Sequence, residues 1–360
     1  MLTSALDYEL PDGLIAQHPP QQRDGGRLLV VSEPLQHCWV RDWPDLVPQN
    51  ALVVLNDTRV MKARVRGQRL PGLGKVEVLF LGPDSSGRAL PGDEQHWRAM
   101  LRSNKPLRVG AEIRVGASVV TVRQLLPDGT RIVSASVPVQ ELQQEHGHVP
   151  LPPYMRRDDV PQDQERYQTV FARELGSAAA PTAGLHLTDA SLGRLRERGV
   201  RIGHLTLHVG AGTFRPVSGE SLDDHPMHEE RFEISAALAH EVNLAKQEQR
   251  PVVAVGTTVV RALESAFVDG KVAPQATSTR LLIQPGYCFR VVDALLTNFH
   301  APRSTLLALV FAFSGEETVR AAYAAAIKES YRFLSYGDAM WLPRGEVSLA
   351  PDGSGEEVHR

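Results

Sequence analysis

Hydrophobic and polar positions follow different periods in three successive stretches of the chain. In the first stretch, up to about residue 60, Leu28–Val31 and Ala51–Leu55 are apolar runs of the length of a buried strand. The second run leads into Asn56–Arg59, a polar segment typical of a loop at the carboxyl end of a strand. This stretch therefore predicts two strands, the second of which opens into a loop suited to binding.

The middle stretch, roughly residues 61–139, is dense in alternating apolar and polar positions and poor in helical pattern. Lys75–Leu81 is one such run, and Val119–Leu126 is followed by Asp128-Gly129, a strong signal for a hairpin turn. Gly and Pro interrupt the region at short intervals. This pattern is typical of a small, all-β barrel.

Beyond the Pro-rich segment Pro150–Tyr154, helical and strand patterns alternate. Such alternation predicts a mainly parallel sheet covered by helices on both faces. Strands are expected at Val200–Val209, Arg231–Ile234, Val252–Val255 and near Leu295. Helices are expected to begin near Thr188-Asp189, Ser235, Thr258, Ser304 and Glu316.

The fold class that follows is an α/β main domain interrupted by an inserted antiparallel β-barrel domain. We expect residues 1–60 and 150–345 to form the discontinuous α/β catalytic domain and residues 61–149 to form the barrel. Residues 346–360 are polar and rich in Gly, so we expect a disordered tail.

Composition narrows the class of protein. Hydrophobic residues make up 42% and charged residues 22%, as in an ordinary globular protein. The chain has no apolar run of about 18 residues, which argues against a membrane span, and Met1–Tyr8 lacks the pattern of an export signal. Its two cysteines, Cys38 and Cys288, are too far apart in sequence for a CxxC motif. A cytoplasmic protein is expected.

The formal net charge of −3 argues against indiscriminate binding of nucleic acid, but it does not exclude a local basic patch. Two runs of basic residues are candidates, although a solvated charged face is the ordinary interpretation of either. The runs are Arg59, Lys62, Arg64, Arg66 and Arg69, and Arg194, Arg196, Arg198 and Arg201.

Polar, chemically capable loops follow four of the expected strands. In an open α/β sheet, ligands bind beyond the carboxyl ends of the strands. Each loop alone is often no more than a helix cap, but four at one sheet edge predict a pocket. The loops are Asn56–Arg59, His208–Thr213, Gly256–Thr258 and Asn298–Thr305.

Histidines cluster in or beside these loops: His186, His208, His225, His228 and His300. A lone histidine is more often structural than catalytic, so each needs further support. His225 and His228 with Glu229 lack the spacing of the H-E-x-x-H zinc motif, and Pro226 argues against a helix there. No metal site is expected.

Two common nucleotide-binding loops are missing from the sequence. No G-x-G-x-x-G connects a strand to a helix, which weakens a Rossmann-type methyltransferase interpretation. No G-x-x-x-x-G-K-[ST] is present either, so a P-loop nucleotidase is disfavoured.

Read in order, these loops and several further motifs strongly resemble the S-adenosylmethionine:tRNA ribosyltransferase-isomerase family of queuosine biosynthesis. The resemblance covers residues 5 to about 342, and the fixed order of so many motifs makes it specific. The motifs are Asp7–Pro11, Arg23-Asp24, L-N-D-T-R at Leu55–Arg59, P-L-P-P-Y at Pro150–Tyr154, Y-Q-T-V-F-A at Tyr167–Ala172, A-P-T-A-G-L-H at Ala180–His186, H-V-G-A-G-T-F at His208–Phe214, M-H-E-E at Met227–Glu230, Gly256–Thr258, N-F-H at Asn298–His300, S-T-L-L at Ser304–Leu307 and S-Y-G-D-A-M at Ser335–Met340.

The chain departs from the family pattern at four positions. Gly26 stands where the family usually has Ser, and Leu187 where it usually has Phe. Val259 and Ala262 replace hydroxyl residues, so we give those two positions no binding role.

The resemblance implies an α/β domain interrupted by a β-barrel, in agreement with the periodicities. It also implies a reaction: the ribosyl part of S-adenosylmethionine is transferred to 7-aminomethyl-7-deazaguanine at the tRNA wobble position and isomerised. The product is epoxyqueuosine, and adenine and methionine are released. The resemblance implies a tRNA with a GUN anticodon as partner and no cofactor beyond S-adenosylmethionine as co-substrate. We expect a monomer without membrane attachment or an obligate protein partner.

This reaction needs a base that removes a proton beside the cationic sulfur and an acid that assists the loss of adenine. Our hypothesis is that His208 or His228 is the base and that Glu229 or Asp57 orients it. His186 or His300 would handle the second proton.

The start of the helix near Thr257 and Thr258 suits the methionine carboxylate, and Arg59 or Arg303 are further candidates to hold it. The other expected substrate-binding residues are Asn56, Thr182, Gly210, Gly212, Thr213, Gly256, Asn298, Ser304, Thr305, Tyr336 and Asp338.

Two other functions compete with this interpretation. A non-catalytic RNA-binding protein would account for the barrel and the arginines but not for the polar loops at four strand ends. An S-adenosylmethionine-dependent RNA methyltransferase is disfavoured by the missing glycine loop. Release of adenine from the donor excludes the first, and transfer of a labelled methyl group to tRNA would favour the second.

Overall fold

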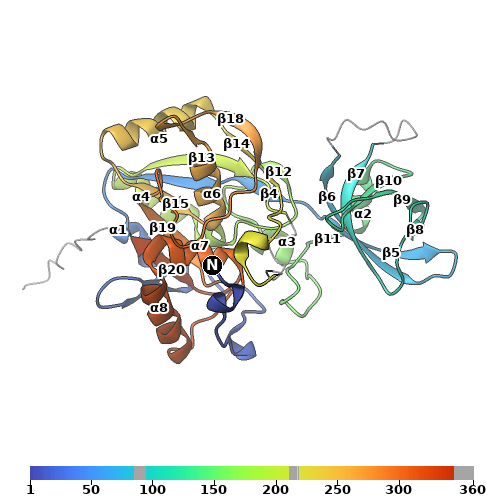
Figure 1. Cartoon of the computed structure of the whole chain (residues 1–360), viewed down its shortest axis with the longest axis horizontal. Helices are drawn as coiled ribbons and strands as arrows, with labels where there is room; N and C mark the ends of the chain where they lie inside the picture. Colours follow the sequence, from blue (N-terminus) through green and yellow to red (C-terminus); the bar gives the residue numbers. More distant parts are fainter. Residues whose placement is uncertain (85–94, 211–216, 218, 344–360) are drawn as a thin grey trace, which may run out of the picture.

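The structure is a computed structural model that describes residues 1–84, 95–210, 217 and 219–343. It shows two bodies side by side (Figure 1): a large sheet with helices, and a small barrel. The chain builds the first strands of the large sheet, passes through the barrel, and returns to complete the sheet. The fold class expected from the sequence is therefore confirmed.

The large sheet is parallel at its centre. Its strand order is β18-β14-β13-β3-β15-β19-β20-β1-β2, and the adjacent strands β13, β3, β15 and β19 run in one direction. β3, β15 and β19 are buried along their whole length, as expected for parallel strands covered on both faces. The bounds are β1 Arg27–Val30, β2 Gln36–Trp39, β3 Leu52–Asn56, β13 Arg201–Leu207, β14 Glu230–Ile234, β15 Val252–Val255, β18 Gln275–Thr279, β19 Ala294–Asn298 and β20 Ala339–Pro343.

Toward its edges the sheet is mixed. β14 is antiparallel to β13 and to β18 on one side, and on the other side β20 is antiparallel to β19. β1 runs parallel to β20 and forms a hairpin with β2. Antiparallel neighbours need no crossover helix, so these strands are added without the strand–helix alternation that marks the centre.

Helices cover both faces of the sheet. Alternate residues of β3 belong to different hydrophobic clusters: Leu52 and Val54 pack with residues of α5 to α8, whereas Val53 and Leu55 pack with residues of α1 and α4. Because successive side chains of a strand point to opposite faces, the two clusters are the cores above and below the sheet. The helices are α1 Trp43–Leu46, α2 Val139–His146, α3 Asp163–Arg166, α4 Asp189–Glu197, α5 Ala236–Gln247, α6 Thr257–Ser265, α7 Thr305–Ser314 and α8 Glu316–Lys328.

Three helix starts expected from the sequence are capped by hydroxyl side chains. Thr188, Ser235 and Ser304 each accept a hydrogen bond from the backbone N–H three residues further on, at 3.1 to 3.2 Å. Such a cap satisfies one of the first N–H groups of a helix, which have no partner inside it. The caps therefore fix where α4, α5 and α7 begin.

The small body is a closed barrel. Its strands run in the order β5-β6-β7-β10-β9-β8, and β8 pairs again with β5, which closes the ring. Gly67 in β5 allows this closure, because a Cβ there would lie 2.6 Å from the backbone oxygen of Arg114 in β8. The bounds are β5 Arg64–Leu70, β6 Lys75–Pro83, β7 Trp97–Ser103, β8 Glu112–Val115, β9 Ser118–Leu125, β10 Arg131–Ala135 and β11 Gly147–His148.

Short elements complete the fold. β4, which follows β3 almost directly, pairs in parallel with β12 beside the barrel. The short strands are β4 Thr58–Val60, β12 Glu174–Ser177, β16 Phe267–Val268 and β17 Lys271–Val272. The 3-10 turns are η1 Thr3–Leu6, η2 Asp12–Leu14, η3 Val40–Asp42, η4 Thr182–His186 and η6 Leu222–Asp224.

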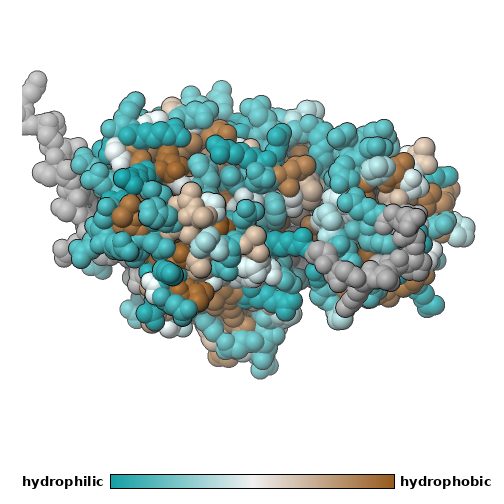
Figure 2. All heavy atoms as spheres, turned by 90° about the horizontal axis from the view of Figure 1, so that it is seen from above, coloured by the Kyte–Doolittle hydropathy of each residue, from teal (hydrophilic) through white to brown (hydrophobic). Residues whose placement is uncertain are grey.

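Hydrophilic side chains dominate the face seen from above, interrupted by separate hydrophobic patches (Figure 2). Across the part of the chain that the structure describes, every helix is too short or too polar to span a membrane. The expected tail, residues 346–360, lies outside the described residues.

Candidate active site

Four polar loops meet at one edge of the large sheet. The loops after Asn56, Leu207, Val255 and Asn298 leave the carboxyl ends of β3, β13, β15 and β19. These strands are parallel and adjacent, so their carboxyl ends lie side by side. The edge is the place where an open α/β sheet binds ligands.

Asn56 ties three of these strand ends together. Its amide nitrogen donates to the backbone oxygen of Leu207 at 3.0 Å and to Oγ1 of Thr258 at 3.3 Å. Its Oδ1 accepts from the backbone nitrogens of Leu207 and Thr58. The side chain is buried and uses both amide atoms internally, so Asn56 holds the geometry of the edge.

His208 follows β13 and lines a cavity. Its Nδ1 is 2.8 Å from Oγ1 of Thr58, the residue that opens β4. A Cβ on Gly176 would lie 2.7 Å from the imidazole ring, so only glycine lets β12 pass this close. Burial, together with the positive charge of Arg231, lowers the pKa of His208, which keeps the imidazole neutral near pH 7.

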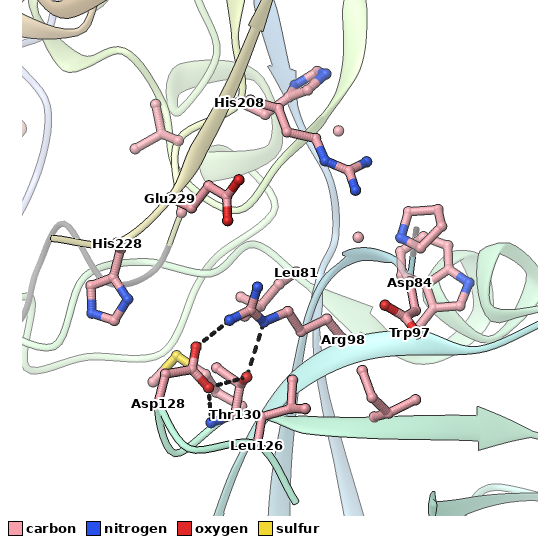
Figure 3. Close-up of a pocket in the computed structure, with 18 of the residues that line it drawn as sticks. Leu81, Asp84, Trp97, Arg98, Leu126, Asp128, Thr130, His208, His228 and Glu229 are labelled. Carbon is pink, nitrogen blue, oxygen red and sulfur yellow. Dashed lines mark hydrogen bonds and ion pairs between the residues drawn. The ribbon is translucent and has the colours of Figure 1, made fainter. Parts of the chain in front are cut away.

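His228 and Glu229 line the same cavity (Figure 3). Glu229 accepts hydrogen bonds from Ser278 and, at 3.0 Å, from Arg280. These two partners lower the pKa of Glu229, so its carboxylate stays charged. In this arrangement Glu229 pairs with a cation and a hydroxyl rather than with the ring of His208.

Asp57 also has a partner other than a histidine. Its Oδ1 accepts a hydrogen bond from Oγ1 of Thr206 at 2.7 Å. Thr58 thus stands at Nδ1 of His208, where the sequence suggested a carboxylate.

A second polar group lies at the other end of the edge, buried in the α/β domain. His186, in η4, contacts the amide nitrogen of Asn298 through Nε2 at 3.0 Å. Asp338 accepts from the backbone nitrogens of Arg27 and Arg332, at 2.9 and 2.8 Å. Burial lowers the pKa of His186 to about 4, so the imidazole of His186 is neutral at pH 7.

His300 belongs to the core. Its Nε2 is 2.9 Å from Oγ1 of Thr297, its backbone nitrogen donates to the hydroxyl of Tyr323, and its backbone oxygen accepts from Tyr8. Burial lowers its pKa to about 3. The structure therefore places His300 among aromatic side chains, away from the cavity that holds His208.

The start of α6 lies beside η4. Gly256 has a φ of 93°, a backbone conformation that favours glycine. A Cβ built on Gly256 would lie 3.6 Å from the Cβ of Ala183 in η4. Thr257 and Thr258 are buried at the first turn of the helix. Thr182, in η4, is half-buried and directly precedes Ala183.

Several other expected binding residues have structural partners. Arg303 pairs with Asp7 at 2.8 Å, and Ser304 caps α7 ahead of the half-buried Thr305. Tyr336 is buried and donates to Asp163 at 2.9 Å. Arg59 is exposed on β4, whereas Gly212 and Thr213 lie outside the described residues.

The cavity has a volume of about 1240 Å³ and lies between the α/β domain and the barrel. His208, Gly210, His228 and Glu229 are the expected site residues that line it. Barrel residues form its other wall, and no local pattern in the sequence could indicate them, because they meet the α/β domain only in the folded chain. They include Trp97, Arg98, Asp128 and Thr130.

A buried ion pair links the cavity to α6. Arg261 of α6 donates to the carboxylate of Glu230, and Glu230 also accepts from the backbone nitrogen of Gly210 at 3.3 Å. Both charged side chains are buried. Among the residues that the structure describes, no group of three or more His, Cys, Asp or Glu side chains is arranged to hold a metal ion.

The structure defines the class of fold: an α/β domain with an inserted β-barrel and a cavity between the two. The family model described as queuosine biosynthesis protein matches residues 3–342, and the chain belongs to this family.

Relatives and a solved structure agree with this assignment. A protein of Sorangium cellulosum named S-adenosylmethionine:tRNA ribosyltransferase-isomerase is 50% identical over 95% of this chain and 98% of its own length. One of the same name from Anaeromyxobacter dehalogenans is 47% identical over 96% of this chain and 100% of its own length. The crystal structure of S-adenosylmethionine tRNA ribosyltransferase from Thermotoga maritima is similar with a TM-score of 0.51 and 30% identity, over 94% of this chain and 99% of that one.

The resemblance found in the motifs is thus confirmed. The expected transferase class, the role in queuosine biosynthesis and tRNA modification are confirmed as well. The two alternatives, a non-catalytic RNA-binding protein and a methyltransferase, gain no support from these matches.

Proposed function

We propose that the chain transfers the ribosyl part of S-adenosylmethionine to 7-aminomethyl-7-deazaguanine at the tRNA wobble position and isomerises it to epoxyqueuosine. Adenine and methionine are the other products. The names of relatives that align over nearly the whole chain support this reaction. The structural observation that carries it is His208, a neutral imidazole in the wall of a cavity that is large enough for a donor and an acceptor.

The chemistry begins at the sulfonium of the donor. Its positive charge acidifies the adjacent ribose C–H, so a base can take this proton and leave the electron pair on carbon as an ylide. Loss of adenine opens the ring, the neutral amine of the acceptor attacks, and ring closure with epoxide formation expels methionine. The sulfonium supplies the electrophilic pull, so we propose S-adenosylmethionine as co-substrate and no further cofactor.

We propose His208 as the base that takes the first proton. If Thr58 accepts a hydrogen bond from Nδ1–H, the other ring nitrogen, Nε2, carries a lone pair that can accept the proton. The lowered pKa of His208 keeps this lone pair available near pH 7. His228 remains the alternative base, and Thr58 replaces Glu229 and Asp57 as the group that orients His208.

The donor is expected to lie between His208 and the start of α6. Backbone N–H groups and the helix dipole at Thr257 and Thr258 suit the methionine carboxylate. We keep His186 or His300 as the proposed handler of the second proton; both are buried, and neither is among the residues that line the cavity of His208.

The partners follow from the same reaction. We propose a tRNA with a GUN anticodon as acceptor, a cytoplasmic location, a monomer and no obligate protein partner. We further propose that residues 61–149 form the barrel domain and residues 1–60 and 150–345 the catalytic domain, since the barrel strands span residues 64–148.

The decisive experiment mixes the purified protein with S-adenosylmethionine and tRNA that carries 7-aminomethyl-7-deazaguanine, and measures adenine, methionine and modified tRNA. Equal amounts of all three support the proposal. If the donor stays intact, the proposed function is wrong. A labelled methyl group found in tRNA would identify a methyltransferase instead.

The choice of base is tested by His208→Ala and His228→Ala in the same assay. Adenine release should be lost in the first variant and largely retained in the second. Full activity of His208→Ala discards the assignment.

A further inference from the structure

Positive charge converges on the cavity from both bodies of the molecule. Arg98 comes from β7 of the barrel, Arg231 from β14, and Arg280 from the segment directly after β18. Arg231 pairs across the ladder with Ser278, two residues before Arg280, so these two arginines lie on one wall. Arg98 lies on the opposite wall.

The guanidinium of Arg98 is held in place by the barrel. Its Nε donates to Oγ1 of Thr130 at 3.0 Å, and a terminal nitrogen donates to Asp128. A guanidinium has five N–H groups, and these two bonds use two of them. Arg98 is thus oriented by its neighbours and still able to donate to a ligand.

The charge of Arg98 reaches across the cavity. Figure 3 shows Glu229 of the α/β domain pointing toward Arg98 of the barrel. Ser278 and Arg280 are the main causes of the lowered pKa of Glu229, and Arg98 adds to it. The two walls therefore belong to one electrostatic site.

The cavity also offers apolar surface. Leu81, Met100, Leu126, Leu175 and Met227 are among its lining residues, and Leu175 is 62% exposed beside His208. Its volume of about 1240 Å³ exceeds the roughly 300–1,000 Å³ of ordinary small-molecule pockets. A nucleotide has both anionic phosphates and a base with apolar faces, so a stretch of RNA fits this combination better than a simple anion does.

Charge is divided unevenly between the two parts of the sequence. Residues 61–149 hold 13 of the 39 Lys and Arg residues but only 8 of the 42 Asp and Glu residues. The barrel segment is therefore net positive, whereas the remainder of the chain is net negative. Such an asymmetry steers a polyanion toward the barrel side of the cavity.

The first basic run named from the sequence, Arg59 to Arg69, lies away from this cavity. Arg64 pairs with Glu77 and donates to the backbone oxygen of Leu151, and Arg66 pairs with Asp158. Among the described residues that line the cavity, none belongs to this run.

We propose that Arg98, Arg231 and Arg280 bind the backbone phosphates on either side of the nucleotide whose base enters the cavity, so that a single-stranded RNA loop lies between the barrel and the α/β domain. This inference rests on the proposed function, in which tRNA is the acceptor. Asp128 and Glu229 keep Arg98 and Arg280 oriented toward the bound backbone.

The test measures binding of a labelled anticodon stem-loop RNA to the full chain at several salt concentrations. Arg98→Gln and Arg280→Gln should each weaken binding at least about tenfold, the loss expected for a charged hydrogen bond. Each should also reduce the slope of log affinity against log salt by about one, because one phosphate contact is lost.

Arg66→Gln is the matched control, because it removes the same charge from an exposed ion pair on the same barrel, outside the cavity. It should leave affinity and salt slope unchanged. Affinity for S-adenosylmethionine, measured by calorimetry without RNA, should be the same in all three variants.

The inference is overturned if Arg98→Gln and Arg280→Gln bind RNA like the wild type, if Arg66→Gln weakens binding equally, or if donor affinity falls together with RNA affinity. The proposed function has a separate readout, since it fails only when the wild-type chain releases no adenine from the donor with modified-precursor tRNA.

Discussion

His208 and His300 both follow strands of the same parallel set, yet their surroundings differ. His208 comes directly after β13, is half-buried, and lies in the wall of the cavity next to Thr58. His300 comes two residues after β19 and is enclosed by the core, where Tyr323 and Phe299 pack together. A place at the carboxyl edge therefore does not decide whether a side chain reaches the cavity; burial separates His208 from His300.

The same substitution at both positions should separate these roles with the largest effect. His208→Gln should lower the rate of adenine release by about 10²–10⁴-fold, the usual contribution of a general base, and leave stability to urea nearly unchanged. His300→Gln should lower stability by about 1–3 kcal/mol, because it disturbs a buried hydrogen bond, and should leave the rate per folded molecule close to that of the wild type. A rate loss in His300→Gln at full stability would break the comparison.

The pH dependence of stability should sharpen this comparison of His208 with His300 further. The pKa of His300 is lowered from 6.5 to about 3, so the unfolded chain binds a proton more readily than the folded one. The stability linked to this group is complete above about pH 6.5 and is lost as the pH falls toward 3.

Between pH 7 and pH 5 this loss amounts to about 2 kcal/mol. Urea unfolding at both pH values should show that the free energy of unfolding of the wild type falls between pH 7 and pH 5. In His300→Gln the fall should be smaller by about 2 kcal/mol. An equal fall in both proteins would mean that His300 is not shielded from protonation.

A smaller effect is expected at the partner of His208. Thr58→Val keeps the shape of the side chain but removes the hydroxyl at Nδ1, so it should lower kcat about tenfold, within the range for a lost hydrogen bond, with little change in KM for the donor. Thr206→Val, which removes the hydroxyl that binds Asp57, is the control and should change kcat less. Equal losses in both would deny Thr58 a specific role in orienting the imidazole.

The smallest effect is expected near His186. A Cβ on Gly26 would lie 3.4 Å from Asp338 and 3.5 Å from the ring of His186, which is ordinary van der Waals contact, and the φ of Gly26 is not in the left-handed region. Gly26→Ala should therefore raise the free energy of unfolding by about 0.4–1 kcal/mol through the unfolded chain and leave kcat unchanged. A loss of stability in thermal unfolding would show that this buried corner tolerates no added atom.

The sequence predicted the centre of the fold well, because the signals there are local. Hydroxyl caps at Thr188, Ser235 and Ser304 and the apolar run Val252–Val255 each mark an element without reference to distant residues. The antiparallel edges were not predicted, since the pairing of β20 with β19 depends on where the chain returns after α8.

The site was predicted in part for the same reason. The residues at the end of a strand are adjacent to it in sequence, so His208 and Asn56 could be predicted as candidates from the loops that follow the expected strands. Contacts such as Glu229 with Ser278 and Arg280, or Arg98 facing Glu229, join residues that are far apart in sequence. Burial, which separates His300 from His208, is likewise a property of the folded chain.

The barrel begins and ends at one place: Arg64, at the start of β5, pairs directly with His148 of β11. A segment whose two ends are already neighbours can be spliced into a host loop with little entropic cost of closure. The α/β domain is therefore a host domain whose insertion enters and leaves at neighbouring residues. Deleting the insertion would leave two chain ends close enough to be joined by a short linker.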